Sequence, residues 1–151
     1  MEYCSPLWAG APASHLSWLH AVETRTFRII GISRNEAESL GLSLNHRRLV
    51  GDLSVFYRLL SSLGPPALSA ICPHHISAGR SRSANNPLLV KLPKSPITAH
   101  LHSFIPHFFS HLWNKLPHSI QSHSSLQAFK TAVHHRLLSS PIQILSLFYP
   151  R

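Results

Sequence analysis

The longest continuous helical pattern of apolar residues in the chain lies between Leu44 and Gly64. Apolar residues recur there every three or four positions, so they stack on one face of an α-helix. This face contains Leu49, Leu53, Phe56, Leu60 and Leu63, widened by Val50 and Tyr57 on one side and by Val55 and Leu59 on the other. Its arc of roughly 220° is about twice that of a surface helix. We therefore expect a central helix that is covered on both flanks, capped by Asn45 and stopped by Gly64 and Pro65.

Three further amphipathic helices are predicted around the central one. They span about residues 14–30, residues 106–115 and a last stretch that is opened by a capping box at Ser124 and Gln127 and runs until Pro141. The positions expected to point inward are Leu16, Leu19, Val22, Phe27 and Ile30 in the first, Phe109, Leu112 and Trp113 in the second, and Leu126, Phe129, Val133 and Leu137 in the third. Residues 33–42 predict a short polar helix or turn.

The segment after the central helix has a different composition. Residues 65–86 are rich in Pro, Ser, Gly and Asn, which predicts a long exposed connection. Residues 87–93 and 97–102 are short apolar runs bounded by prolines, which predict a small β-hairpin. The predicted fold is mainly α, with about four helices around one central buried helix, a small β-hairpin and long loops. Residues 1–139 are expected to form one domain and residues 140–151 a hydrophobic tail.

Charge is distributed unevenly along the chain, whose formal net charge is +9. All five acidic residues lie in the first 52 positions, where five arginines balance them. After Asp52 the chain contains nine lysines and arginines, ten histidines and no carboxylate side chain. This excess favours a polyanionic partner, with nucleic acid the best candidate. The alternative is a solvated basic surface that has no partner.

The two cysteines, Cys4 and Cys72, form neither a disulfide framework nor a C-x-x-C pair. This favours a reduced, intracellular chain, with a nuclear location as one option. No signal peptide is expected, because Glu2 stands where the basic start of one would lie and prolines interrupt the apolar run that follows. Residues 142–149 are the longest apolar tail, and they fall far short of the ~20 residues that span a bilayer. We therefore expect no membrane partner.

The residue types argue against the common catalytic sites. Phosphoryl transfer on two metal ions needs several converging carboxylates. Asp52 is the only acid on a well-defined core element, and its expected partner is Arg48, one turn earlier. The chain also lacks a G-x-S-x-G elbow, an acid after position 52 to orient a base, and a Gly-rich phosphate loop. We expect neither catalytic residues nor a cofactor.

Histidine spacing offers one weak metal-binding pattern. His107 and His111 lie four residues apart on a predicted helix, which is the spacing of two ligands on one face. Cys72, His74 and His75 add further potential donors. However, thirteen histidines produce such spacings by chance, and no second cysteine pair completes a zinc site. Ordinary surface or half-buried histidines are the preferred interpretation.

Basic residues that could hold phosphates are the remaining candidates. The candidate nucleic-acid-binding residues are Arg47, Arg48, Arg80, Arg82, Lys91 and Lys94. The first two open the central helix, the next two lie in the long connection, and the lysines flank the predicted hairpin turn. Such cations contact phosphates without reading bases, so affinity should fall steeply with salt. The helix dipole disfavours arginines at a helix N-terminus, which weakens the case for the first pair.

Several fragments occur together in an order that resembles a known protein family. They are MEYCSPLW at 1–8, residues 15–28, LNHRRL at 44–49, FYR at 56–58, RSR at 80–82, SFIP at 103–106, LWNKLP at 112–117 and LQAFK at 126–130. Over about residues 1–139 they are similar to the C-terminal region of the reverse transcriptase of non-LTR retrotransposons of the jockey type. The chain departs from that family at Asn45, where an acid is usual, and after Pro106, where Pro-Arg-Thr is usual.

This resemblance implies a thumb and post-thumb segment without an active site. The catalytic aspartates of the family lie in a palm that would precede Met1, and its endonuclease lies earlier still. The implied function is non-catalytic contact with RNA or DNA backbone, or no selected function in a degenerate copy. The rival class is a protein-interaction module, because the wide apolar arc of the central helix would suit contact with a missing polymerase palm domain.

Overall fold

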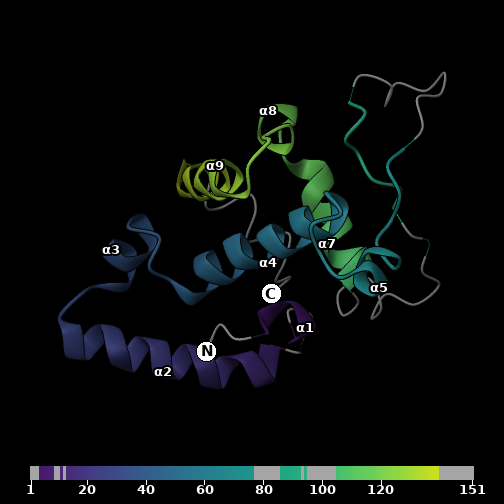
Figure 1. The fold of residues 1–151 in the computed structure, drawn as a ribbon. Coiled ribbons are helices and arrows are strands. Elements are labelled where there is room, and N and C mark those ends of the chain that lie inside the picture. Colours follow the sequence, from purple (N-terminus) through teal and green to yellow (C-terminus); the bar gives the residue numbers. More distant parts are fainter. Residues whose placement is uncertain are drawn as a thin grey trace.

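The computed structural model describes residues 4–8, 11, 13–76, 86–92, 94 and 105–139. Over these residues the chain is mainly helical (Figure 1), which confirms the predicted fold class. The helices are α1 (Ser5–Trp8), α2 (Ala13–Ile30), α3 (Arg34–Ser39), α4 (Leu44–Leu60), α5 (Pro66–Ser69), α7 (Ile105–Lys115), α8 (His118–Gln121) and α9 (Leu126–Ser139). None of these described helices combines the length and apolarity needed to cross a membrane.

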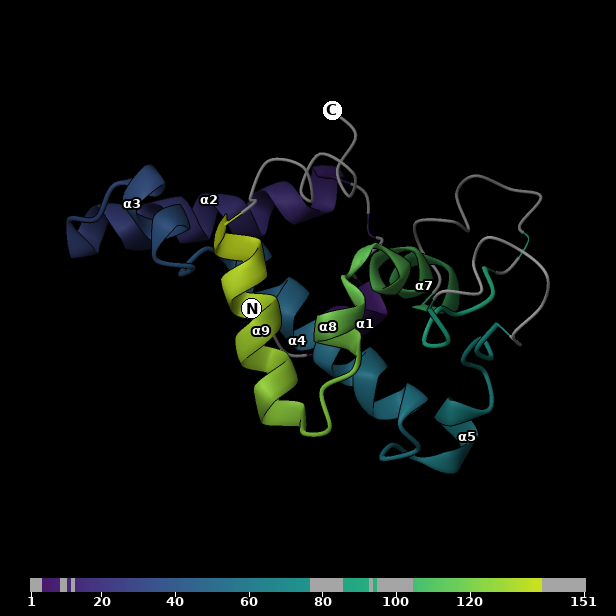
Figure 2. The ribbon, with the colours of Figure 1, turned by 90° about the horizontal axis from the view of Figure 1, so that it is seen from above.

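The predicted central helix is α4, and ten of its seventeen residues are buried. It contacts α1, α5, α7 and α9, and α9 crosses over it in the view from above (Figure 2). The side chains of the predicted apolar face that are buried are Leu49, Leu53, Phe56, Tyr57 and Leu59. Neighbouring helices of the same chain cover these side chains, whereas Val55 and Leu63 of the predicted face are 40% and 59% exposed.

Both ends of α4 differ from the predicted ones. Ser43 caps the helix in place of Asn45, with an extended backbone and an Oγ that accepts a hydrogen bond from the His46 N–H at 3.4 Å. The helix ends at Leu60, and Ser62 takes the left-handed conformation there, with φ of 56°. The N–H of Leu63 then donates to the carbonyl of Arg58 at 2.9 Å, which closes a Schellman-type C-cap before Gly64 is reached.

The core lies where α4, α7 and α9 meet, and aromatic rings fill its centre. The Tyr57 and Phe129 rings stack with their centroids 4.6 Å apart. Trp113 of α7 lies 6.0 Å from Phe56 and 5.8 Å from Phe129, in both cases between ring centroids. The predicted burial of Phe109, Leu112 and Trp113 is confirmed, as is that of Phe129, Val133 and Leu137 in α9. The capping box was predicted one residue too early, at Ser124. In the structure Ser125 caps α9, and its Oγ accepts the hydrogen bond from the Ala128 N–H at 3.1 Å.

The predicted β-hairpin is not supported. In the part of the chain that the structure describes, Val90 forms a single antiparallel bridge with His75, and there is no sheet. Asn114 explains why, because its side-chain amide bonds the N–H and the carbonyl of Val90 at 2.9 and 2.8 Å. These are the backbone groups that a neighbouring strand would use. The second predicted strand, residues 97–102, lies outside the described residues.

Helix α2 forms as predicted, but its inward face is only partly the predicted one. Leu16 is buried, whereas Val22 and Ile30 are 50% and 60% exposed. Glu23 takes the inward place next to Val22 and is 7% exposed. The helix lies at the outer edge of the fold (Figure 1), so only one narrow side of it packs against the rest of the chain.

Candidate nucleic-acid interface

Two of the acidic side chains point into the fold. The Glu23 carboxylate accepts a hydrogen bond from the Leu44 N–H, the first N–H of α4, and lies 3.3 Å from His20 Nδ1. A negative charge at this end of α4 is favoured by the helix dipole. Glu23 therefore joins α2 to α4 and leaves the outer surface of α2 without an acidic side chain.

The second buried acid is Asp52, which is 3% exposed and accepts a hydrogen bond from the Ser5 hydroxyl of α1. Burial raises its pKa to about 6, while the Ser5 hydrogen bond and the positive charge of Arg48 act in the opposite direction. The predicted attraction between Arg48 and Asp52 is therefore felt by the Asp52 carboxyl group. The hydrogen bond from Ser5 to Asp52 joins α1 to α4.

Arg48 is itself buried, and this corrects its predicted role as a phosphate contact. Its side chain is 4% exposed, and Cζ lies 4.6 Å from the centroid of the Trp8 ring, in a cation–π contact. A phosphate at the surface cannot reach a guanidinium held between α1 and α4. Of the two arginines that open α4, only Arg47 is exposed.

The exposed charges of the described chain are therefore strongly biased. The exposed carboxylates are Glu36 and Glu38, both on α3, where Glu38 pairs with Arg34 at 3.2 Å. The exposed cations are Arg25, Arg28, Arg34, Arg47, Arg58, Lys91, Lys94, Lys115 and Arg136. Over the described residues outside α3, the surface carries positive side chains and no exposed carboxylate.

The structure describes only some of the remaining predicted residues. Lys91 and Lys94 are exposed in the segment that follows the Val90 bridge, far along the chain from Arg47. Arg80 and Arg82 lie outside the described residues. His111 is exposed, and the side chain of His107 is not among those described. No three potential metal ligands come together within the described part of the chain.

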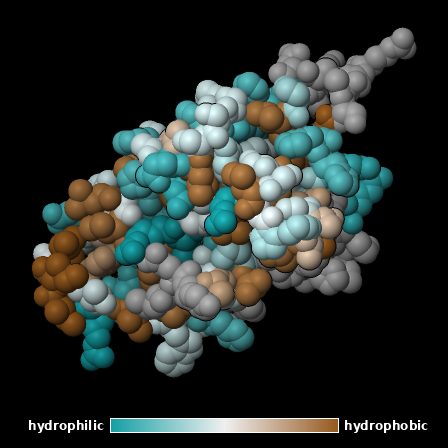
Figure 3. All heavy atoms as spheres, viewed as in Figure 1, coloured by the Kyte–Doolittle hydropathy of each residue, from teal (hydrophilic) through white to brown (hydrophobic). Residues whose placement is uncertain are grey.

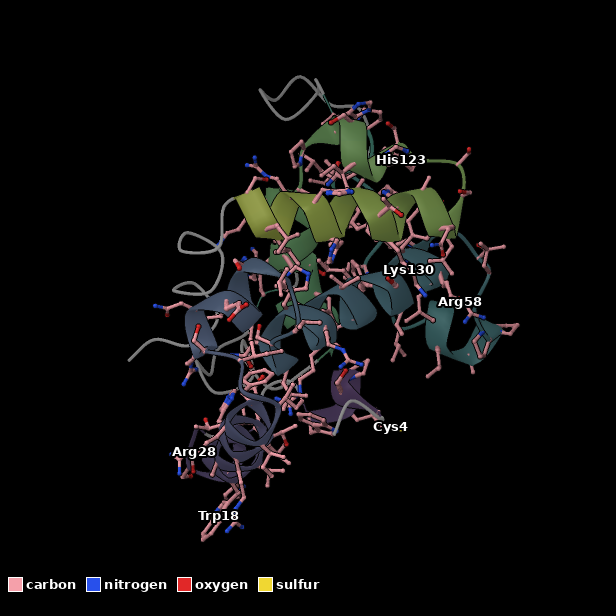
Figure 4. All side chains as sticks on the ribbon, turned by 90° about the vertical axis from the view of Figure 1, so that its left-hand side faces the viewer. Cys4, Trp18, Arg28, Arg58, His123 and Lys130 are labelled. Atoms are coloured by element: carbon pink, nitrogen blue, oxygen red, sulfur yellow. The ribbon has the colours of Figure 1, made fainter. Side chains whose placement is uncertain are left out.

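Two cations that the sequence interpretation did not select lie at the crossing of α4 and α9. Arg58 follows Tyr57 and Lys130 follows Phe129, so the stacked pair of rings brings these two cations to the same crossing (Figure 4). Arg58 also shares a helix face with Arg47, because eleven residues are close to three full turns, or about 16 Å of helix. The sequence signal was Arg58 at a polar position of the central helix pattern, but only the packing of α9 adds Lys130.

We call the exposed face of α4 the α4 ridge, defined by Arg47, Gly51, Val55 and Arg58. All four residues are exposed, and they follow one another at spacings of three or four. A Cβ added at Gly51 would have nothing within 4 Å, so the middle of the ridge is open. The ridge thus places a cation at each end of an open surface, and the half-buried Lys130 belongs to α9, which crosses the same helix.

A pocket of about 300 Å³ is lined by residues of α4, α7 and α8 together with His75 and Leu88. Its walls include Tyr57, Trp113 and the imidazoles of His75 and His123. The Tyr57 hydroxyl donates to the His123 carbonyl, and the Trp113 N–H to the Leu88 carbonyl, each at 2.7 Å. These hydrogen bonds hold the walls of the pocket together, so the role of Tyr57 and Trp113 here is structural.

A histidine pair joins α4 to α9 near the start of the ridge. His46 Nε2 and His134 Nδ1 lie 2.7 Å apart, with the rings edge to face. Gly41 packs against both rings with φ of 67°, and a Cβ there would come within 2.8 Å of the His134 ring. Burial lowers the pKa of His46, and the neighbouring His134 lowers it further. The lowered pKa favours the neutral form of the His46 ring in the folded chain.

We expect the contribution of His46 to the free energy of unfolding to fall as the pH drops below about 6.5, because His46 then binds a proton more readily in the unfolded chain. Above the unfolded pKa the contribution is complete, and within the titration window it changes by up to about 1.4 kcal/mol per pH unit. His46→Gln should flatten this dependence, whereas the exposed His118→Gln should not. Urea unfolding followed by circular dichroism, compared for the three proteins between about pH 5 and pH 7.5, measures the slopes. Equal slopes for wild type and His46→Gln would contradict this assignment.

No family model, curated protein or solved structure matches this chain. The resemblance to the C-terminal region of jockey-type reverse transcriptases therefore stays a hypothesis based on the sequence fragments. A function for the chain has to be argued from the arrangement of its charges, of which the α4 ridge with Lys130 is the best-defined group.

Proposed function

We propose that this chain binds the backbone of RNA or DNA without regard to sequence and without catalysing a reaction on it. In this proposal it derives from the thumb and post-thumb region of a non-LTR retrotransposon reverse transcriptase. The observation that carries the proposal is the segregation of charge: Glu23 and Asp52 are buried, while the cations of α4 are exposed. Carboxylates that point inward do not repel a phosphate chain at the surface.

The α4 ridge is the proposed contact surface. Its cations, Arg47 and Arg58, are separated by about 16 Å along the helix, and Gly51 leaves room for a backbone to lie between them. Arginine side chains suit this role because their planar guanidinium groups match the geometry of phosphate oxygens. Contacts of this kind release bound counterions, so they are sensitive to salt and indifferent to base sequence.

Charge reversal on the ridge tests the proposal. We expect Arg47→Glu/Arg58→Glu to weaken binding to a primed RNA–DNA hybrid by about tenfold or more, and to reduce the slope of log Kd against log salt by about 2. Fluorescence anisotropy at increasing KCl concentrations measures both quantities. Circular dichroism of the variant checks that the fold is kept, since both side chains are exposed.

The matched control is Arg25→Glu/Arg28→Glu, which makes the same change in net charge on the exposed side of α2. Its binding and salt slope should stay closer to those of the wild type. Equal losses in the two variants would mean that net charge alone holds the nucleic acid, and would contradict the ridge. A wild type that does not bind at low salt would contradict the function itself and favour a copy with no selected function.

A further inference from the structure

Helix α2 carries a second apolar stripe on its outer side. Trp18, Val22 and Ile29 are 77%, 50% and 80% exposed, and Arg25 lies between the last two. Their spacing of four, three and four residues places all four side chains on one helix face. We call this face the α2 stripe. Trp18 and Arg28 project from α2 away from the other helices (Figure 4).

The stripe is not the face by which α2 joins the fold. The inward face is formed by Leu16, Glu23 and Phe27, which are buried or half-buried and lie about half a turn away. Figure 3 shows apolar side chains gathered at the end of the molecule where α2 runs into α3. Ile29 and Ile30 are the last two residues of α2 and are 80% and 60% exposed. Single exposed apolar residues are ordinary, whereas several of them gathered on one helix face mark an interaction surface.

The charges beside the stripe discriminate between occupants. Arg25 lies within the stripe and Arg28 beside it, and the one acid of α2, Glu23, is buried. A second copy of the chain, packed antiparallel on the stripe about a two-fold axis, would place the two Arg25 side chains close to that axis. Neither α2 offers an exposed carboxylate to offset this repulsion. Charge complementarity instead favours a partner that brings its own acidic residues.

We propose that the α2 stripe docks an amphipathic partner helix whose apolar seam is flanked by glutamate or aspartate. Trp18 is the anchor, because a large exposed indole gains most from being covered, and tryptophan and arginine dominate binding energy at interfaces. Arg25 pairs with an acidic residue beside the seam of the partner. This surface is separate from the α4 ridge, so it adds a protein partner to the nucleic acid of the proposed function.

The experiment is a selection from displayed helical peptides of about 20 residues, with a fixed leucine seam and flanking positions randomised over Glu, Lys, Gln and Ser. The bait is the full chain. We expect glutamate to be enriched at the flanks, and the selected peptides to bind Trp18→Ser/Ile29→Ser at least about tenfold more weakly than the wild type. Both substituted side chains are more than three-quarters exposed, so the variant should keep its fold by circular dichroism.

Two further variants make the outcome specific. Arg25→Glu should reverse the preference, so that lysine-flanked peptides become the better binders. Leu68→Ser removes a 48% exposed apolar side chain on α5 and should leave peptide binding unchanged. A primed RNA–DNA hybrid should not displace the peptide, and this separates the stripe from the function proposed for the ridge.

The following results would overturn the proposal. Peptides selected without acidic flanks would show that the stripe does not choose its partner by charge. An equal enrichment on Trp18→Ser/Ile29→Ser would show that the peptides bind elsewhere on the chain. A dimer in sedimentation equilibrium that this double variant dissociates would assign the stripe to a second copy of the chain. A selection that yields no binding peptide would show that the stripe is not a docking surface for helices.

Discussion

Replacing Trp113 by alanine is expected to lower the free energy of unfolding by about 4 kcal/mol, which is a large share of the stability of a small domain. Trp113 is 2% exposed, and its ring contacts those of Phe56, Tyr57 and Phe129 at the junction of three helices. Its removal leaves a cavity that these rings cannot fill without moving. It also leaves the Leu88 carbonyl without the indole N–H that now donates to it at 2.7 Å.

Chemical denaturation followed by circular dichroism measures this effect, and two variants frame it. Trp113→Phe keeps a ring in the core but loses the hydrogen bond, so it should cost less than the alanine variant. Trp18→Ala removes the same side chain from a site that is 77% exposed, and we expect a change within about 0.5 kcal/mol. If Trp113→Ala were no more destabilising than Trp18→Ala, the result would contradict the position of Trp113 at the centre of the core.

The second large effect is expected from Asp52→Asn, which should raise the free energy of unfolding near neutral pH by up to about 3 kcal/mol. Burial holds the pKa of Asp52 at about 6 in the folded chain, against 3.8 in the unfolded one. The folded chain therefore binds the Asp52 proton more tightly than the unfolded chain. The contribution of this group to the free energy of unfolding is complete below pH 3.8 and is lost as the pH rises towards about 6. Asparagine does not ionise, and its carbonyl oxygen still accepts from the Ser5 hydroxyl.

The signature of this effect is a difference between variant and wild type that grows with pH. Urea unfolding at about pH 3.5, 5 and 7 should give a difference near zero at the lowest pH and the full difference at the highest. Glu36→Gln is the control, because it makes the same chemical change at an exposed position of α3 and should shift stability by at most a few tenths of a kcal/mol. A difference that shrinks as the pH rises would contradict the burial of Asp52.

The sequence by itself determined where the longer helices lie and which side of most of them is buried. Leu49 and Leu53 in α4, and Phe129 and Val133 in α9, are buried as their spacing predicted. Periodicity reports this because the period of a helix is a local property of the chain. Helix ends were predicted less accurately, since Ser43 and Asn45 carry equally suitable capping oxygens and only the path of the chain selects one.

The tertiary structure decided the pairings between distant residues, and these define both the candidate interface and the stripe. Asn114 binds the N–H and the carbonyl of Val90, so these two groups are not available to a neighbouring strand. Trp8 of α1 covers Arg48, which left Arg47 as the exposed arginine of a pair that looks equivalent in sequence.

The same distinction separates the two faces of α2. Val22 is outside because Glu23, its neighbour, is drawn inward by the N–H of Leu44, which lies 21 residues away in the chain. A spacing rule identifies residues that share a face, but it does not say which element that face will meet. That depends on how helices from distant parts of the chain pack together, so charge, burial and exposure at these positions are properties of the fold.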